Sequence, residues 1–220
     1  MPVPSEHTLQ VSEIFTSIQG ETTRAGLPCA FVRLSGCNLH CSYCDTRYAA
    51  EEEGTAMDLD TVVARTHGAG THLVCITGGE PLLQPAAVPL AGELTGLGHT
   101  VLVETNGTRN TSPLPPEVVR VLDVKCPGSG ECGRTLMSNL NALRPQDEVK
   151  FVLCSRRDFD WACGFARRYG LLGRCHVLFA PAHGVLPAVQ LADWILESVL
   201  NVRLQLQIHK ILWPAKTRGA

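Results

Sequence analysis

Residues 36–46 read GCNLHCSYCDT and contain three cysteines, Cys37, Cys41 and Cys44. The spacing is uneven, with three residues between the first two cysteines and two between the next pair. A structural zinc ion usually takes four protein ligands, often as two separated pairs, and the chain has no second Cys-x-x-Cys pair. Three soft thiolates in one loop instead suit a 4Fe–4S cluster. They would bind three irons and leave the fourth iron for a non-protein ligand.

Two alternatives to a cluster stay open on spacing alone. A zinc ion could use the three cysteines together with His40, or with the distant Cys126 or Cys132. His40 adjoins Cys41, however, so both side chains would have to turn toward one ion within a cramped loop. The three thiols could also be incidental, because cysteines are common as small buried apolar residues. The spacing favours the cluster over both alternatives.

The composition describes an ordinary globular chain. It has 220 residues, of which 45% are hydrophobic and 18% charged, and a formal net charge of −2. Such a chain can bury one large core, and it shows no overall basic signal for nucleic acid. No segment reaches the roughly 18 apolar residues of a membrane helix, and the N-terminus does not resemble a secretory signal. We therefore expect a cytoplasmic protein without a nucleic-acid or membrane partner, whose ten cysteines are not paired as disulfides.

Short apolar runs alternate with helix-compatible segments along the chain. We expect strands at residues 29–35, 72–77, 100–105, 120–124, 148–153 and 175–180, and helices at 59–66, 87–97, 137–143, 158–169 and 189–200. This order predicts an α/β fold with about six βα units and a mostly parallel sheet. A full (β/α) barrel takes about 250 residues, so a partial barrel or an open doubly wound sheet is expected. Both place ligands at the carboxyl ends of the strands, where the cysteine loop begins.

The cysteine spacing resembles the signature of the radical S-adenosylmethionine (SAM) superfamily, whose fold is a full or partial (β/α) barrel. A second segment, ITGGEP at residues 76–81, resembles the glycine-rich SAM-binding motif of that superfamily. On its own this segment would be interpreted as a turn into a helix. The resemblance implies that Tyr43 lies near the adenine of SAM, that Gly79 and Glu80 hold the cofactor, and that Thr77 faces the substrate.

Further motifs narrow the family. These are SIQGE (17–21), VETNGT (103–108), DVKCPGSGE (123–131), EVKFV (148–152) and QIHKILWP (207–214). In this order they resemble the 7-carboxy-7-deazaguanine synthases. The resemblance implies a radical SAM lyase of the carbon–nitrogen type, which converts 6-carboxy-5,6,7,8-tetrahydropterin to 7-carboxy-7-deazaguanine with loss of ammonia, for queuosine and other 7-deazapurines. It also implies a 4Fe–4S cluster, SAM that is regenerated after a 5′-deoxyadenosyl radical has acted at C6, and Mg²⁺.

The same resemblance assigns residues to the site. It implies that SAM also contacts Glu104, Asp123 and Lys125. It implies that the substrate is bound, besides Thr77, by Ile18, Gln19, Gly20, Glu21, Arg33, Asn106, His209 and Pro214.

Side-chain chemistry agrees in part with these assignments. The amide of Gln19 and the carboxylate of Glu21 can pair with a heterocycle, and the guanidinium fork of Arg33 suits a carboxylate. Taken singly, these residues could belong to a solvated N-terminal hairpin. For Mg²⁺, residue type alone would select Asp45. The resemblance instead implies Thr46 as the ligand, and we interpret Asp45 as a residue that orients the loop.

We expect one radical SAM domain over residues 1–220, with an N-terminal substrate-binding segment at 11–35 and a C-terminal closing segment at 202–214. The tail at 215–220 matches nothing in the family pattern. The family also implies a homodimer and an electron donor of the flavodoxin or ferredoxin type. Two other functions stay open: a radical SAM activase, which would need a broad surface for its protein partner, and a non-catalytic zinc-binding module.

Overall fold

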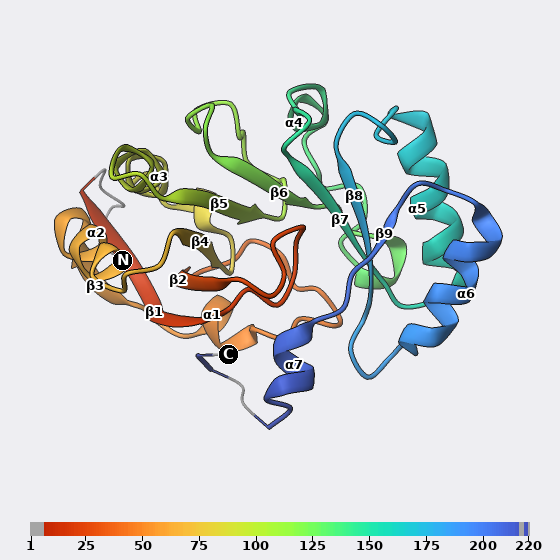
Figure 1. Cartoon of the computed structure of the whole chain (residues 1–220), viewed down its shortest axis with the longest axis horizontal. Coiled ribbons are helices and arrows are strands. Elements are labelled where there is room, and N and C mark those ends of the chain that lie inside the picture. Colours follow the sequence, from red (N-terminus) through yellow and green to blue (C-terminus); the bar gives the residue numbers. More distant parts are fainter. Residues whose placement is uncertain (1–6, 216–217, 220) are drawn as a thin grey trace.

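The computed structural model describes residues 7–215 and 218–219, and within them one nine-stranded sheet forms the centre of the fold (Figure 1). The strand order is β3-β1-β2-β4-β5-β6-β7-β8-β9. The strands are β1 (Thr8–Ile18), β2 (Pro28–Leu34), β3 (Thr55–Asp58), β4 (Leu73–Gly78), β5 (Thr100–Thr105), β6 (Val119–Asp123), β7 (Glu148–Leu153), β8 (His176–Pro181) and β9 (Arg203–Leu204). All neighbours from β2 to β9 are parallel, whereas β1 is antiparallel to both β2 and β3.

Helices and short turns connect the strands. They are α1 (Arg47–Glu51), α2 (Leu59–His67), α3 (Ala87–Gly96), α4 (Met137–Asn141), α5 (Arg156–Arg168), α6 (Ala188–Ser198) and α7 (Ile208–Leu212), with 3-10 turns η1 (Pro81–Leu83) and η2 (Pro127–Ser129). The sheet curves without closing, since β3 and β9 form its two edges. The predicted partial (β/α) barrel with a mostly parallel sheet is therefore confirmed, and the six predicted strands correspond to β2 and β4–β8.

Two apolar cores cover the outer face of the sheet. One core packs α2 and α3 against β1, β2, β4 and β5, and the other packs α4, α5 and α6 against β6, β7 and β8. Helix α5 shows the pattern clearly: Phe159, Ala162 and Ala166 are buried, whereas Arg167 and Arg168 are exposed, as its apolar stripe predicts. Every second side chain of these strands points outward, and the two cores bury these outward side chains.

The inner face of the sheet changes character along the strands. A third apolar cluster lies on this face, formed by Cys29, Phe31, Leu73, Cys75, Leu102, Val119 and Val121. Because side chains alternate in direction along a strand, the next inward positions belong to Arg33, Thr77, Glu104 and Asp123. The concave side therefore has an apolar floor with polar groups at the carboxyl ends of the strands.

Two properties of the chain bear on its setting. All ten cysteines are free. Within the described residues, no helix combines the length and the apolar character needed to cross a bilayer.

Candidate active site

One cavity of about 1330 Å³, a volume that includes its open mouth, lies on the concave side of the sheet. Every residue predicted for the site except Glu80 and Pro214 lines this cavity. The residues come from the β1–β2 loop, the ends of β2 and β4–β6, the cysteine loop and α7. The fold thus brings together motifs that are far apart in the sequence.

The cysteine loop lies against the end of β4. Cys37, Cys41 and Cys44 all line the cavity, and the backbone N–H of Glu80 donates to the carbonyl of Gly36 at 2.8 Å. A Cβ atom on Gly79 would overlap the Gly36 carbonyl oxygen and crowd Cys37. The glycine pair therefore allows the SAM-type motif and the cysteine loop to touch backbone to backbone.

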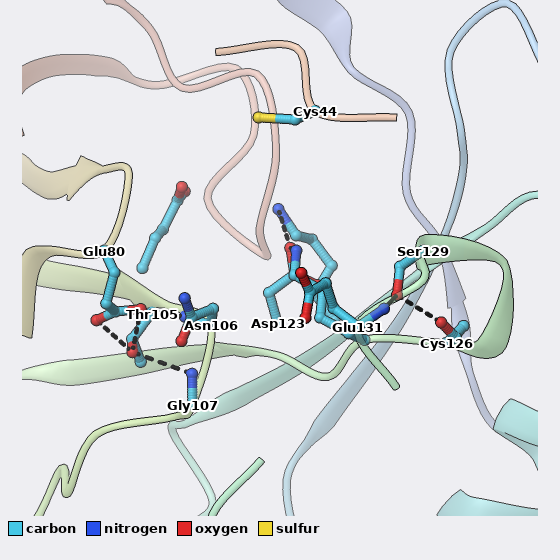
Figure 2. Close-up of polar contacts among 12 residues, drawn as sticks. Cys44, Glu80, Thr105, Asn106, Gly107, Asp123, Cys126, Ser129 and Glu131 are labelled. Carbon is cyan, nitrogen blue, oxygen red and sulfur yellow. Dashed lines mark hydrogen bonds and ion pairs between the residues drawn. The ribbon is translucent and has the colours of Figure 1, made fainter. Parts of the chain in front are cut away.

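The other side of the cysteine loop is fixed by the segment around η2. Ser42 donates from its backbone N–H to the Ser129 carbonyl at 3.0 Å and from its hydroxyl to the Gly128 carbonyl at 2.8 Å. The backbone N–H of His40 donates to Glu131 at 2.8 Å. Ser129 in turn donates to the carbonyl of Cys126 at 2.6 Å, as Figure 2 shows.

The three residues weighed as a fourth zinc ligand lie apart from the cavity. His40, Cys126 and Cys132 are not among its lining residues, and Cys126 is fully buried. The donor set that faces the cavity is thus three thiols from one loop. This set fits a 4Fe–4S cluster with an open iron better than it fits a four-ligand zinc ion.

Glu80 is fully buried and supports the end of β5. Its carboxylate accepts a hydrogen bond from the Thr105 hydroxyl at 2.8 Å (Figure 2). It also accepts from the backbone N–H groups of Asn106 at 2.6 Å and Leu82 at 3.0 Å. Burial raises the pKa of Glu80, although these hydrogen bonds oppose the shift. Glu80 holds the backbone of Asn106, and the side-chain amide of Asn106 donates to Asn38 at 3.1 Å and lies 3.9 Å from the Cys37 sulfur. The direct contact of Glu80 with SAM remains a prediction.

A chain of buried charges crosses the cavity. The Lys150 ammonium lies 2.7 Å from Glu21 and 3.8 Å from Asp123, and the Lys125 ammonium lies 2.9 Å from Asp123. Burial opposes the charge on Lys150, but Glu21 and Asp123 outweigh it and raise the pKa of this lysine. Charged groups concentrated in a cavity are costly to bury and mark a binding site.

Lys150 is a site residue that the sequence analysis did not assign. It lies within the EVKFV motif, on the inner face of β7. The available signal was the pair of charged residues, Glu148 and Lys150, among the apolar residues of one strand, because charged side chains at such positions are buried and need partners. Gln207 and Lys210 of the QIHK motif were also missed, although both line the cavity.

Arg33 is bound through its Nε atom, which leaves the two terminal nitrogens of its guanidinium facing the cavity. Its Nε donates to Glu13 at 2.7 Å, and Tyr48 donates its hydroxyl to the same carboxylate oxygen at 2.7 Å. Glu13 faces Arg33 directly across the β1–β2 pair, and the guanidinium lies 5.5 Å from the ring centre of Phe15. The terminal nitrogens of Arg33 therefore remain for an anionic ligand.

Glu104 lies beside Arg33 and Lys150 at the end of β5. It accepts a hydrogen bond from the Thr77 hydroxyl at 3.0 Å. Burial raises the pKa of Glu104, while Lys150 opposes this shift and Glu21 adds to it. The neighbouring charges thus influence the pKa of this carboxyl group. Glu104 and Thr77 both line the cavity.

Three buried polar atoms in the cavity wall lack a partner among the described residues. They are the amide nitrogen Nε2 of Gln19, the hydroxyl of Tyr43 and Oδ1 of Asp123. Buried polar groups in folded proteins almost always have a hydrogen-bond partner, so these atoms indicate a ligand that supplies it. Their donor and acceptor types fit a nucleoside-like cofactor and a nitrogen-rich heterocycle.

Helix α7 covers one side of the cavity. The backbone N–H of Ile208 donates to the Gly20 carbonyl at 3.0 Å, and a Cβ on Gly20 would overlap the His209 ring. Lys210 binds Asp45 at 2.5 Å, and Gln207 donates to the same carboxylate at 3.2 Å. Burial lowers the pKa of His209, so its imidazole is neutral at pH 7.

Both candidates for a magnesium ligand, Asp45 and Thr46, line the cavity. The Asp45 carboxylate is engaged by α7, whereas the Thr46 hydroxyl lies 4.0 Å from the Cys44 sulfur, and the choice of Thr46 remains a prediction. Pro214 is exposed and lies outside the cavity lining, so its contact with substrate remains a prediction. In the tail, the backbone N–H of Gly219 donates to Glu13 at 3.0 Å, while residues 216–217 and 220 lie outside the described residues.

Comparison with known proteins agrees with this geometry. The model of the radical SAM superfamily matches residues 31–124, which include the cysteine loop and the glycine pair. The 7-carboxy-7-deazaguanine synthase of Koribacter versatilis is 43% identical and covers 96% of this chain and 100% of its own length. The enzyme of the same name from Chlorobaculum tepidum is also 43% identical, with coverages of 98% and 99%.

Solved structures support the fold. The crystal structure of QueE from Escherichia coli matches with a TM-score of 0.75 and 22% identity, over 91% of this chain and 94% of that chain. Streptococcus suis SuiB bound to S-adenosylmethionine matches with a TM-score of 0.56 and 14% identity, over 78% of this chain and 48% of that chain. With its full-length relatives, its cysteine loop and its partial barrel, the chain belongs to the 7-carboxy-7-deazaguanine synthase family of radical SAM enzymes.

Proposed function

We propose that this chain converts 6-carboxy-5,6,7,8-tetrahydropterin to 7-carboxy-7-deazaguanine with release of ammonia, as a radical SAM lyase in queuosine and 7-deazapurine biosynthesis. The observation that carries the proposal is the single cavity in which three loop thiols meet a set of charged and unpartnered polar groups. A zinc-binding module has no need of this set of charged groups, and a protein-activating enzyme, which would share the cysteine loop, would need a broad docking surface for its partner. Full-length relatives named as synthases agree with a small-molecule substrate.

The cysteine loop and the strand ends would hold the cofactors. Cys37, Cys41 and Cys44 would bind the 4Fe–4S cluster, which when bound and reduced would supply the electron for cleavage of SAM. The backbone at Gly79 holds the methionine end of SAM next to the cluster. Tyr43 offers its unpartnered hydroxyl and Asp123 its free oxygen to the nucleoside end, and Lys125 binds the other carboxylate oxygen of Asp123.

The polar groups opposite the cluster would hold the pterin. Gln19 offers its free amide nitrogen to a ring carbonyl or ring nitrogen, and Glu21 accepts from ring N–H groups. The terminal nitrogens of Arg33 bind the 6-carboxylate as a fork. Glu104 and Thr77 lie next to this carboxylate, and neutral His209 covers the opposite side. The segments 11–35 and 202–214 therefore act as substrate-binding and closing segments of a single domain.

Mg²⁺ completes the proposed site at Thr46. Magnesium prefers oxygen ligands and retains several of its bound waters. One protein hydroxyl and the substrate carboxylate are therefore enough to complete its coordination. Thr46 lines the cavity, and among the described residues its hydroxyl has no hydrogen-bond partner nearer than the Cys44 sulfur at 4.0 Å.

Three further properties belong to the proposal. A flavodoxin- or ferredoxin-type protein delivers the electron, since His40 and Ser42 expose the cysteine loop at the surface. The chain forms a homodimer, for which the exposed apolar Ile211 and Leu212 on α7 are candidate contacts. It works in the cytoplasm, where reducing conditions preserve ten free thiols.

An anaerobic turnover assay tests the reaction directly. The protein is reconstituted with iron and sulfide and then given dithionite, SAM, Mg²⁺ and 6-carboxytetrahydropterin. Mass spectrometry should detect 7-carboxy-7-deazaguanine, and Cys41→Ala should form neither the cluster absorbance nor the product. Cys132→Ala, at an exposed thiol outside the cavity, serves as the control. A wild-type protein that cleaves SAM without forming this product would overturn the assigned substrate, and one that binds zinc without colour would overturn the cluster.

A further inference from the structure

The tip of the β1–β2 loop, residues 19–27, leaves its own strands and reaches β7 across the concave face of the sheet (Figure 1). Three strands, β4, β5 and β6, lie between β2 and β7 in the sheet order. The loop carries Gln19 and Glu21. Their assignment as pterin-binding residues rests on the proposed function. The hairpin still pairs Gln19 with Gly26 and Leu27, and α7 contacts Gly20, so it is residues 21–24 beyond them that contacts with β7 must fix.

Glu148 makes the most extensive contact between β7 and the loop. Its side chain is fully buried and accepts from the Thr23 hydroxyl at 2.6 Å, the Thr23 backbone N–H at 3.1 Å and the Arg24 guanidinium at 3.2 Å. A carboxylate buried in this way needs all of these donors, because an unpaired buried charge is strongly unfavourable. The contact joins residues 125 positions apart in the chain.

A second charged contact runs in register with the first. Along β7, Glu148 and Lys150 lie on the same face, and they bind Thr23 and Glu21, which are also two residues apart. Between them Thr22 is buried and has a φ of 68°, a left-handed conformation that is unfavourable for a threonine. Such a conformation persists only where its surroundings impose it, and here β7 holds the residues on both sides.

The anchored backbone sets the side chain that faces the ligand. The backbone N–H of Glu21 donates to Oε1 of Gln19 at 3.1 Å, which leaves Nε2 of Gln19 buried in the cavity wall without a partner. We propose that Glu148 is a positioning residue: by holding Thr23 and Arg24 it fixes the loop in the one arrangement that presents Gln19 and Glu21 to the substrate. Glu148 itself does not line the cavity.

The variant that tests this role is Glu148→Gln, measured in the reconstituted full-length enzyme. Asp147→Asn is the matched control, because Asp147 is an equally buried carboxylate whose partners, Arg120 and Arg144, lie outside the loop. We expect Glu148→Gln to raise the KM for 6-carboxytetrahydropterin about tenfold, with the cluster absorbance and the affinity for SAM unchanged. Asp147→Asn should lower the melting temperature but leave this KM within about twofold of wild type.

A second readout does not depend on turnover. Trypsin cleaves after Arg24, and this bond should be cut faster in Glu148→Gln than in wild type or Asp147→Asn, because the loop is released from β7. Should the wild type make no 7-carboxy-7-deazaguanine, the proposed function fails, while the rate of cleavage at Arg24 still decides whether Glu148 holds the loop.

Thr23 supplies a milder pair of variants in case Glu148→Gln does not fold. Thr23→Ala should show the same change in KM and in cleavage at Arg24 to a smaller degree, and Thr23→Ser, which keeps the hydroxyl, should restore both. An unchanged KM together with unchanged cleavage in Glu148→Gln, or in Thr23→Ala if the former is unfolded, overturns the proposal. An equal rise in KM in Asp147→Asn would do the same, because the effect would then be one of general stability.

Discussion

Thr46 is the residue at which side-chain identity matters most for the proposed metal. Within the described part of the chain its hydroxyl has only the 4.0 Å approach to the Cys44 sulfur, so a magnesium ion can bind it without displacing a short hydrogen bond. Thr46→Ala should keep the cluster absorbance and raise the Mg²⁺ concentration for half-maximal turnover about tenfold, since only one of several oxygen ligands is lost. Thr46→Ser should stay close to wild type. An identical magnesium titration for the alanine variant would exclude this residue as a ligand.

His209 links the site to pH. Burial holds the pKa of His209 below its ordinary value of 6.5, so the unfolded chain takes up this proton at a higher pH than the folded chain. Stability that depends on the neutral imidazole is therefore present above pH 6.5 and is lost as the pH falls toward the folded pKa. The melting temperature of wild type should drop more between about pH 7.5 and 5.5 than that of His209→Gln. Equal drops would show that His209 does not contribute.

The residues of the site could be predicted from the sequence to the extent that they lie in short motifs at strand ends. The cysteine spacing, the glycine pair and Arg33 are local signals of this kind. The pairing of these residues could not be predicted, because Glu21 and Lys150 are 129 positions apart and only the curvature of the sheet brings them together. The buried position of Glu80 was not predictable for the same reason.

At the scale of elements, a strand or helix could be predicted from the sequence only where it is long enough and its pattern of apolar residues is unbroken. The predicted strands are continuous apolar runs, which follow from burial on both faces. The antiparallel strand β1 was not predicted as a strand because its alternation breaks: Leu9 and Val11 face the outer core, and after an irregularity between Val11 and Glu13 the outward position passes to Ile14. Strands β3 and β9 and helices α1 and α7 span five residues or fewer, too short for a periodic signal.

The contact of α7 with the β1–β2 loop can be tested through Gly20. A methyl group there would overlap the His209 ring, so Gly20→Ala should push α7 away and raise the KM for the pterin about tenfold or more, with the cluster intact. Gly164→Ala is the control, since a methyl group at this position in α5 meets no atom and should stabilise the helix by about 0.5–1 kcal/mol. A normal KM for Gly20→Ala would mean that α7 does not shape the substrate site.

At the scale of the whole molecule, two outer cores share one continuous sheet. Phe179 lies fully buried in the second core, with the rings of Phe151 and Phe159 at 5.6 and 5.7 Å. Phe179→Ala should lower the free energy of unfolding by about 3–5 kcal/mol. Leu196→Ala, at a side chain that is 77% exposed, should change it by no more than about 0.5 kcal/mol.

Because β5 and β6 join the two cores through the sheet, we expect Phe179→Ala to shift a single unfolding transition. Denaturant titrations followed by fluorescence and by circular dichroism should give coincident curves. Two separate transitions, with only the second sensitive to Phe179, would show instead that the cores unfold independently.

The open sheet also bears on how the protein behaves at high concentration. A partial barrel has two free edges, and a long free edge can recruit strands from other molecules into aggregates. Here the edges are β3, with four residues, and β9, with two. They cover only Thr8–Val11 of β1 and Leu178–Phe179 of β8. The rest of the β1 edge carries an irregularity in its register and the inward-pointing charge of Glu13, and both features disfavour pairing with a strand of another molecule.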